Sequence, residues 1–91
     1  MLLKSVSDGR ITGTGTLEFE SRILGGVLIS ADGTNAAVVT VQADNSSGAT
    51  VFSLSSESPI FVAGPIAIGS SAGYYSVTGT GGAAQFYEWV E

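Results

Sequence analysis

The sequence contains no histidine and no cysteine, and its only positive side chains are Lys4, Arg10 and Arg22. Without cysteine, neither a disulfide nor a thiolate nucleophile can form. Without histidine, the usual general base and the usual nitrogen ligand for a metal are missing. The serines have no basic partner to activate them apart from Lys4. We therefore expect no enzyme activity, no catalytic residues, no cofactor and no metal site.

The shortage of positive charge also excludes two classes of partner. The net charge is −5, and nucleic-acid binding depends on lysine and arginine to neutralise phosphates. A basic membrane-surface helix is excluded for the same reason. No apolar run approaches the roughly 20 residues of a membrane helix, and Lys4 interrupts the short apolar start. We expect a soluble chain that binds neither nucleic acid nor membrane.

Length and composition indicate one small domain. A chain of 91 residues buries only about 60–65% of the surface that its unfolded form exposes, so small domains are usually reinforced by disulfides, metals or oligomerisation. Because disulfides and histidine- or cysteine-based metal sites are excluded, oligomerisation remains. Charged residues make up only 12% of the chain, which favours a surface covered largely by copies or partners.

Short β-prone segments, separated by turns rich in glycine, serine and asparagine, fill the rest of the chain. They recur at spacings of roughly 8–12 residues, and no window has helical periodicity, which is typical of a sandwich or barrel. We predict an all-β fold, a single small antiparallel β-sandwich of about eight strands. Residues 1–15 form an N-terminal arm or edge strand, and residues 16–91 form the sandwich. The predicted strands are 2–6, 17–23, 27–31, 37–43, 50–55, 60–62, 66–68, 74–78 and 83–90.

Several dipeptides predict where strands end. Gly25-Gly26 and Gly64-Pro65 are expected to break strands, and Asp32-Gly33 is expected to form a hairpin-type connection. Pro59 places the following strand at a sheet edge. In residues 83–90, alternation puts Phe86, Glu88 and Val90 on one face and Tyr87 and Trp89 on the other.

Three motifs suggest chemistry but have simpler explanations. The glycines at 13–15 and 79–82 lack the helix N-terminus that a phosphate loop requires, so structural turns are favoured. Residues 44–48 hold oxygen ligands suited to calcium but no closing glutamate, which favours a hairpin turn. Glu18 and Glu20 share a predicted strand face, as a glycosidase pair would. A solvated face, or pairing with Arg22, is the favoured interpretation.

The aromatic residues near the C-terminus admit three interpretations. Tyr74, Tyr75, Tyr87 and Trp89 cannot all face the same way, so both sheet faces there carry large rings. Filling the core is favoured for most of them. A contact between subunits and a platform that stacks sugars are the alternatives, since aromatic residues are enriched at the centres of interfaces.

A succession of short motifs over about residues 24–90 resembles small virion proteins of tailed bacteriophages. The motifs are Val39-Thr40-Val41 before Asp44-Asn45-Ser46-Ser47-Gly48-Ala49-Thr50, then Gly64-Pro65-Ile66, Gly73-Tyr74-Tyr75, and Thr78-Gly79-Thr80-Gly81 before Phe86-Tyr87. The resemblance implies a jelly-roll-like sandwich of about this length, without catalytic residues, that assembles as a trimer or another homo-oligomer.

The resemblance further implies a capsid decoration (cement) protein on the virion surface, which stabilises the head by binding between subunits of the major capsid protein. The alternative is a tail or fibre component, or a carbohydrate-binding module that recognises a receptor. The partners expected are copies of the chain and the major capsid protein. The candidate interface residues are Leu2, Leu3, Ile11, Tyr74, Tyr75, Tyr87 and Trp89.

Overall fold

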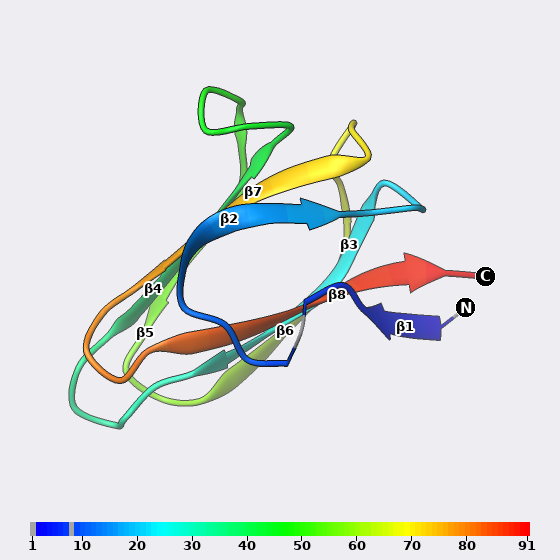
Figure 1. Ribbon diagram of the computed structural model, residues 1–91. Helices are drawn as coiled ribbons and strands as arrows, with labels where there is room; N and C mark the ends of the chain where they lie inside the picture. The colour runs from blue at the N-terminus through cyan, green and yellow to red at the C-terminus, as the bar shows by residue number, and fades with distance from the viewer. Residues whose placement is uncertain (1, 8) are drawn as a thin grey trace.

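The computed structural model describes residues 2–7 and 9–91, which form two four-stranded antiparallel sheets packed face to face (Figure 1). No helix occurs in this part of the chain. The predicted small β-sandwich of about eight strands is confirmed. The strands are β1 (Leu2–Ser5), β2 (Gly13–Glu18), β3 (Ile23–Ser30), β4 (Ala37–Ala43), β5 (Thr50–Ser56), β6 (Ile60–Ala67), β7 (Ala72–Thr78) and β8 (Ala83–Val90).

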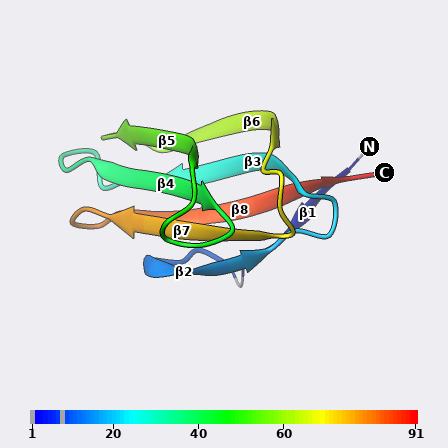
Figure 2. The ribbon, with the colours of Figure 1, turned by 90° about the horizontal axis from the view of Figure 1, so that it is seen from above.

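The strand order is that of a jelly roll. Sheet A has the order β1-β8-β3-β6, and sheet B has the order β2-β7-β4-β5. The early and late strands therefore pair as β1 with β8, β2 with β7 and β3 with β6, alternately in one sheet and in the other. In Figure 2, β4 of sheet B overlies β3 of sheet A, and β7 overlies β8.

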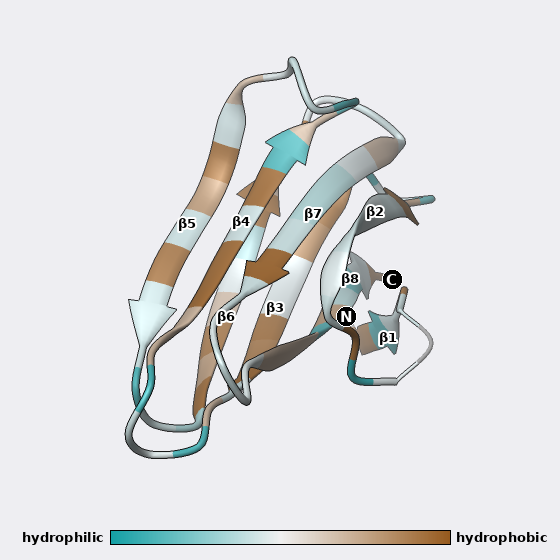
Figure 3. Ribbon diagram, turned by 60° about the vertical axis from the view of Figure 1, so that its left-hand side comes forward, coloured by the Kyte–Doolittle hydropathy of each residue, from teal (hydrophilic) through white to brown (hydrophobic). Residues whose placement is uncertain are grey.

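The core follows from strict alternation along the strands. Brown and pale segments alternate along β5 and β4 in Figure 3, because every second residue points between the sheets. Both sheets contribute to one continuous cluster. Its buried residues are Leu17, Phe19, Leu24, Val27, Ile29, Ala37, Val39, Val41, Phe52, Ile68, Val77, Ala84 and Phe86.

Within segment 1–15, residues 2–5 and 13–15 lie in edge strands, and the described residues between them form a connecting loop. Strand β1 is the edge of sheet A, and Leu2 pairs with Val90. The Ile11 N–H donates to the Ala84 carbonyl at 2.8 Å and so ties the following loop to β8. Strand β2 begins at Gly13 and is the edge of sheet B, so the predicted boundary at 15/16 falls inside a strand.

The predicted strand 17–23 is wrong, because the chain turns between the two sheets there. Strand β2 ends at Glu18 in sheet B, and β3 begins at Ile23 in sheet A. Arg22 has a φ of 60°, and its N–H donates to the Phe19 carbonyl at 3.3 Å. Phe19 before the turn and Leu24 after it are buried in the core, whereas Ile23, the first residue of β3, is half-buried and outside the core cluster, so the alternation shifts by one residue at the turn.

The two dipeptides expected to break strands lie inside strands. At Gly25-Gly26, β3 continues through a β-bulge between Leu24 and Gly26, which accommodates the extra residue. Strand β6 runs through Gly64-Pro65 as one element. It is an edge strand of sheet A, as Pro59 predicted. Proline has no N–H to donate to a neighbouring strand, so it is tolerated at an edge, where one side of the strand has no neighbour.

The Asp32-Gly33 connection joins the two sheets, so the predicted hairpin-type connection is wrong. It links β3 of sheet A to β4 of sheet B. Asp32 organises it: Oδ1 accepts the N–H groups of Asn35 (2.7 Å) and Thr34 (2.8 Å), and Oδ2 accepts from Asn35 Nδ2 at 3.0 Å. These bonds, that of the Asn35 N–H first, lower the pKa of Asp32 below its ordinary value of 3.8.

Candidate functional site: the outer face of sheet A

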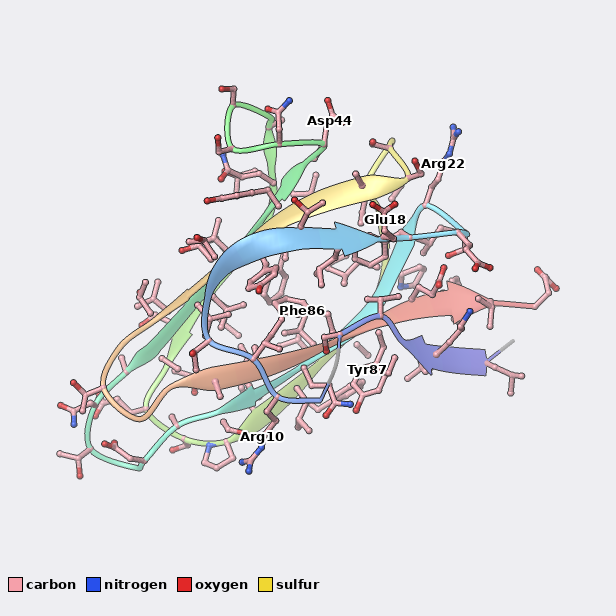
Figure 4. All side chains as sticks on the ribbon, viewed as in Figure 1. Arg10, Glu18, Arg22, Asp44, Phe86 and Tyr87 are labelled. Carbon is pink, nitrogen blue, oxygen red and sulfur yellow. The ribbon has the colours of Figure 1, made fainter. Side chains whose placement is uncertain are left out.

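The outward side of sheet A gathers large apolar side chains from all four strands. Strand register places them together: Leu3 is opposite Trp89, and Leu28 is opposite Phe61. Tyr87 lies between them on β8, on the side of that strand away from Phe86 (Figure 4). We call this set the apolar face. Its members are Leu3, Leu28, Phe61, Tyr87 and Trp89.

Two glycines shape the apolar face. A Cβ on Gly26 would lie 2.5 Å from Cζ of Phe61, and a Cβ on Gly25 would lie 2.6 Å from Cδ2 of Leu3. The two glycines at the bulge therefore leave room for the side chains of Phe61 and Leu3 to pack closely against the backbone of β3. Phe61 and Tyr87 meet edge to face, with ring centroids 6.2 Å apart. Such pairs add about 0.5–1.5 kcal/mol beyond their buried area, so the rings hold each other in place.

The apolar face carries no charged side chain among the described residues. Only Lys4, Glu18 and Glu88 of the described charged residues lie in strands. Glu88 is buried between the sheets, Lys4 shares its side of sheet A, and Glu18 lies in sheet B. The others lie in loops or at the C-terminal end, including Arg10, Arg22 and Asp44, which are labelled in Figure 4.

The outer face of sheet B has a different chemistry. Register aligns hydroxyls in a row across all four strands, from Thr14 through Ser76 and Thr40 to Ser53. Val38, which is 40% exposed, is its one large exposed hydrophobic residue. Burying a hydroxyl without a partner costs about 1–3 kcal/mol, so this face favours water or a partner that supplies hydrogen bonds.

A small cavity adjoins the apolar face at the end of β8. It has a volume of about 410 Å³, and Trp89 forms part of its wall. Ser21 and Glu91 give it a hydroxyl and a carboxylate beside the indole. This is the size of a pocket for a small polar ligand. Its lining residues are Ser21, Ile23, Trp89, Val90 and Glu91.

Known proteins offer no guide to these surfaces. The chain matches no family model, no curated protein and no solved structure. What the faces and the cavity can bind is therefore inferred from their own chemistry.

The structure separates the predicted interface residues into four places. Leu3, Tyr87 and Trp89 lie on the apolar face, and Leu2 lies beside Leu3 on β1, 64% exposed. Tyr74 lies on the outer side of sheet B, paired with Thr16 and Gln42. Tyr75 points inward and packs on Phe86, with ring centroids 5.7 Å apart. Ile11 is half-buried against the core.

Leu28, Phe61 and the two glycines complete the apolar face and were missing from the predicted set. Phe61 lies in a run that the sequence places at a sheet edge, and an exposed aromatic residue there was the available signal. Leu28 joins it only through the pairing of β3 with β6, which brings residues far apart in the sequence together.

The predicted pairing of Glu18 and Glu20 on one strand face is wrong. Glu18 is in β2, but Glu20 lies in the turn after it. Of the two expectations for these glutamates, a solvated position or a pairing with Arg22, Glu20 has the first: it is exposed, and its ion pair is with Lys4, with Nζ to Oε1 at 3.7 Å. An exposed pair of this kind contributes about 0–1 kcal/mol.

The motifs that resemble ligand loops are parts of the β framework. Residues 44–48 form the predicted hairpin turn, between β4 and β5, in which Asn45 Oδ1 accepts the Ser47 N–H at 2.9 Å. Gln42 Nε2 donates to the carbonyls of Ser46 and Gly48 and closes the turn. The glycines at 79–82 turn β7 into β8 as predicted, whereas those at 13–15 lie within β2 and form no turn.

Glu88 is a buried charged residue, and nothing in the sequence indicated its burial. It is 1% exposed, on the inward side of β8 with Phe86. Its Oε1 accepts the backbone N–H of Ser21 at 2.8 Å, so the carboxylate fastens the turn between β2 and β3 to sheet A. Its role in the described structure is to position that turn.

Within residues 2–7 and 9–91, no three aspartate or glutamate residues lie close enough together to hold one metal ion. None of the described segments is a helix long and apolar enough to cross a membrane.

Proposed function

We propose that the protein is a structural subunit of a phage virion, a capsid decoration protein that stabilises the head by binding between major capsid protein subunits. The charge-free apolar face supports this proposal. A broad surface of this kind suits extended protein contact, whereas chemistry would need convergent polar groups in a cleft. The jelly roll also occurs in viral capsid proteins, which is support by analogy of fold.

The two outer faces suit a subunit lodged among neighbours. The apolar face and the hydroxyl face lie on opposite sides of one thin sandwich, and each offers a different kind of contact. Contacts that are individually weak gain affinity when several are made at once, as they are when copies of a subunit are linked. A cement protein therefore needs no single tight site.

The test is cosedimentation with emptied heads of the phage that encodes the chain. We expect saturable binding and a higher temperature of head disruption when the protein is bound. Absence of binding to heads contradicts the proposal. Binding to tails in place of heads would assign the protein to the tail or fibre.

A matched pair of variants tests the role of the broad faces. Phe61→Glu and Val38→Glu each place a carboxylate at an exposed apolar position, 45% exposed on sheet A and 40% exposed on sheet B. We expect at least one of them to weaken head binding by about ten-fold or more, because a charge must then be desolvated in the contact. Unchanged binding by both contradicts attachment through these faces.

The cavity beside Trp89 favours a second candidate, a carbohydrate-binding module. An indole can stack on a sugar ring while Ser21 and Glu91 accept its hydroxyl protons. Trp89 is the only tryptophan, so its fluorescence reports occupancy directly. A saturable change with one sugar of a panel, lost in Glu91→Ala, supports this candidate. A flat response throughout the panel contradicts it.

A further inference from the structure

We propose that the apolar face is the contact between two copies of this chain, related by a two-fold axis. The inference rests on the proposed function, a virion subunit that acts through its broad faces, and it assigns one of these faces to a contact between copies of the chain. In a two-fold contact both partners present the same patch. One self-complementary face is therefore sufficient, and no second complementary surface has to exist.

Charge selects this face for a second copy. The chain carries a net charge of −5, so two copies repel wherever their acidic loops approach. The described charged side chains lie in loops, at the C-terminal end, between the sheets or in sheet B, and none lies on the apolar face. Two copies that meet there keep most of their carboxylates outside the contact, with Glu91 at its edge in the wall of the cavity beside Trp89.

Hydration distinguishes the apolar face from the opposite one. A copy docked on sheet B would remove water from the hydroxyl row of Thr14, Ser76, Thr40 and Ser53. Those hydroxyls would need new partners to offset the loss of water. On the apolar face the groups removed from water are mainly side-chain carbons of Leu3, Phe61 and Trp89, whose burial is favourable without new hydrogen bonds. The polar side chains of the same outer side, Gln85 and Ser5, already bond to each other, with Gln85 Nε2 donating to Ser5 Oγ at 3.3 Å.

The apolar face offers exposed side chains for such a contact, since Leu3 is 46% and Phe61 is 45% exposed. The aromatic side chains provide the anchors typical of interface centres, with Phe61 and Tyr87 held edge to face. Sheets packed in this way lie about 10 Å apart.

The same two variants test the inference on the free protein. Light scattering after size-exclusion chromatography, from micromolar to millimolar concentration, should give twice the chain mass for the wild type. Phe61→Glu places like charges across the two-fold axis, so its dimer dissociation constant should rise by about ten-fold or more. Val38→Glu adds the same charge to sheet B and should leave the dimer intact. Circular dichroism checks that both variants fold.

The fluorescence of Trp89 gives a second measurement that needs no variant. Its emission should shift to longer wavelength as the wild type is diluted below its dissociation constant, because the indole returns to water. A monomeric or trimeric wild type, or a dimer broken by Val38→Glu and not by Phe61→Glu, overturns the inference. A dimer that fails to bind phage heads leaves the inference standing and contradicts the proposed function.

Discussion

At the scale of the residue, Glu88 is the side chain whose replacement should destabilise the fold. Its carboxylate is buried between the sheets, and the bond to the Ser21 N–H fastens the β2–β3 turn to β8. This turn carries the chain from one sheet to the other, and two backbone hydrogen bonds also hold it, from the Phe19 N–H to the Ser71 carbonyl and from the Ile68 N–H to the Arg22 carbonyl. A buried acceptor therefore offsets its desolvation only while its partner is in place.

We predict that Glu88→Ala lowers the free energy of unfolding by about 2–4 kcal/mol, because it leaves the Ser21 N–H unpaired and opens a cavity. Glu88→Gln keeps an acceptor oxygen and should cost about 1 kcal/mol or less. Urea denaturation followed by Trp89 fluorescence measures both. Equal losses in the two variants would show that the lost charge, and not the hydrogen bond, matters.

Asp32 makes stability depend on pH in a defined direction. Its folded-state pKa is lowered, chiefly by the Asn35 N–H, so the carboxylate stabilises the fold above its unfolded pKa of about 3.9. That contribution is lost as the pH falls through the lower folded-state value. The Asp32→Asn variant keeps an acceptor oxygen at this position, but its amide does not titrate.

We therefore predict that acid reduces the melting temperature of the wild type more than that of Asp32→Asn. The difference between their melting temperatures should be constant from neutral pH down to about pH 5 and should shrink toward about pH 2. Thermal melts in a pH series measure it. Parallel curves throughout would mean that the bonds to Thr34 and Asn35 do not favour the ionised form.

At the scale of the element, the sequence predicted strands where alternation is unbroken. The predicted strands 37–43 and 83–90 coincide with β4 and β8, and the faces assigned to Phe86 and Tyr87 are correct. The prediction failed where the chain changes sheets: Phe19 and Ile23 fit one alternation in the sequence, but Leu24 and not Ile23 continues the core after the turn. Glycines at a β-bulge within a strand and glycines at the end of a strand also look alike in sequence.

The candidate site was predictable only in part, for a related reason. Alternation placed Tyr87 and Trp89 together because they lie on one strand. It could not add Leu28 and Phe61, because the contacts of β3 with β6 and β8 depend on register between distant segments. Tyr74 and Tyr75, adjacent in sequence, lie on opposite sides of sheet B for the same period-two reason.

Two glycines in the connections test how much the loops constrain the fold. Gly79 (φ 103°) and Gly33 (φ 90°) share a backbone conformation that side chains rarely adopt. A Cβ on Gly33 would meet nothing within 4 Å, whereas one on Gly79 would collide with the Ala36 carbonyl oxygen. We predict that Gly33→Ala costs about 1–2 kcal/mol and Gly79→Ala about 2 kcal/mol more. Urea denaturation measures the free energy of unfolding of both variants. Equal losses would mean that the β7–β8 turn shifts to accommodate the added Cβ.

At the scale of the whole molecule, the distribution of charge organises the surface. The net charge is −5, most of the described charged side chains lie in loops or at the C-terminal end, and none lies on the apolar face. This arrangement leaves one face on which two copies of the acidic chain can approach without facing like charges. A charged patch on sheet A would destroy that division, which is the physical basis of the Phe61→Glu test.

The same distribution predicts how salt affects association. The contact itself contains no charged side chain among the described residues, so adding salt has no ion pair within it to weaken. The acidic loops of the two copies still repel at a distance, and salt screens that repulsion because the Debye length falls from about 30 Å at 0.01 M to about 10 Å at 0.1 M. We predict that the dimer becomes modestly tighter as salt rises, by a few-fold across this range. Sedimentation equilibrium at several sodium chloride concentrations measures it. An association held together by ion pairs would loosen instead, and that result would move the contact from the apolar face to the charged rim of the molecule.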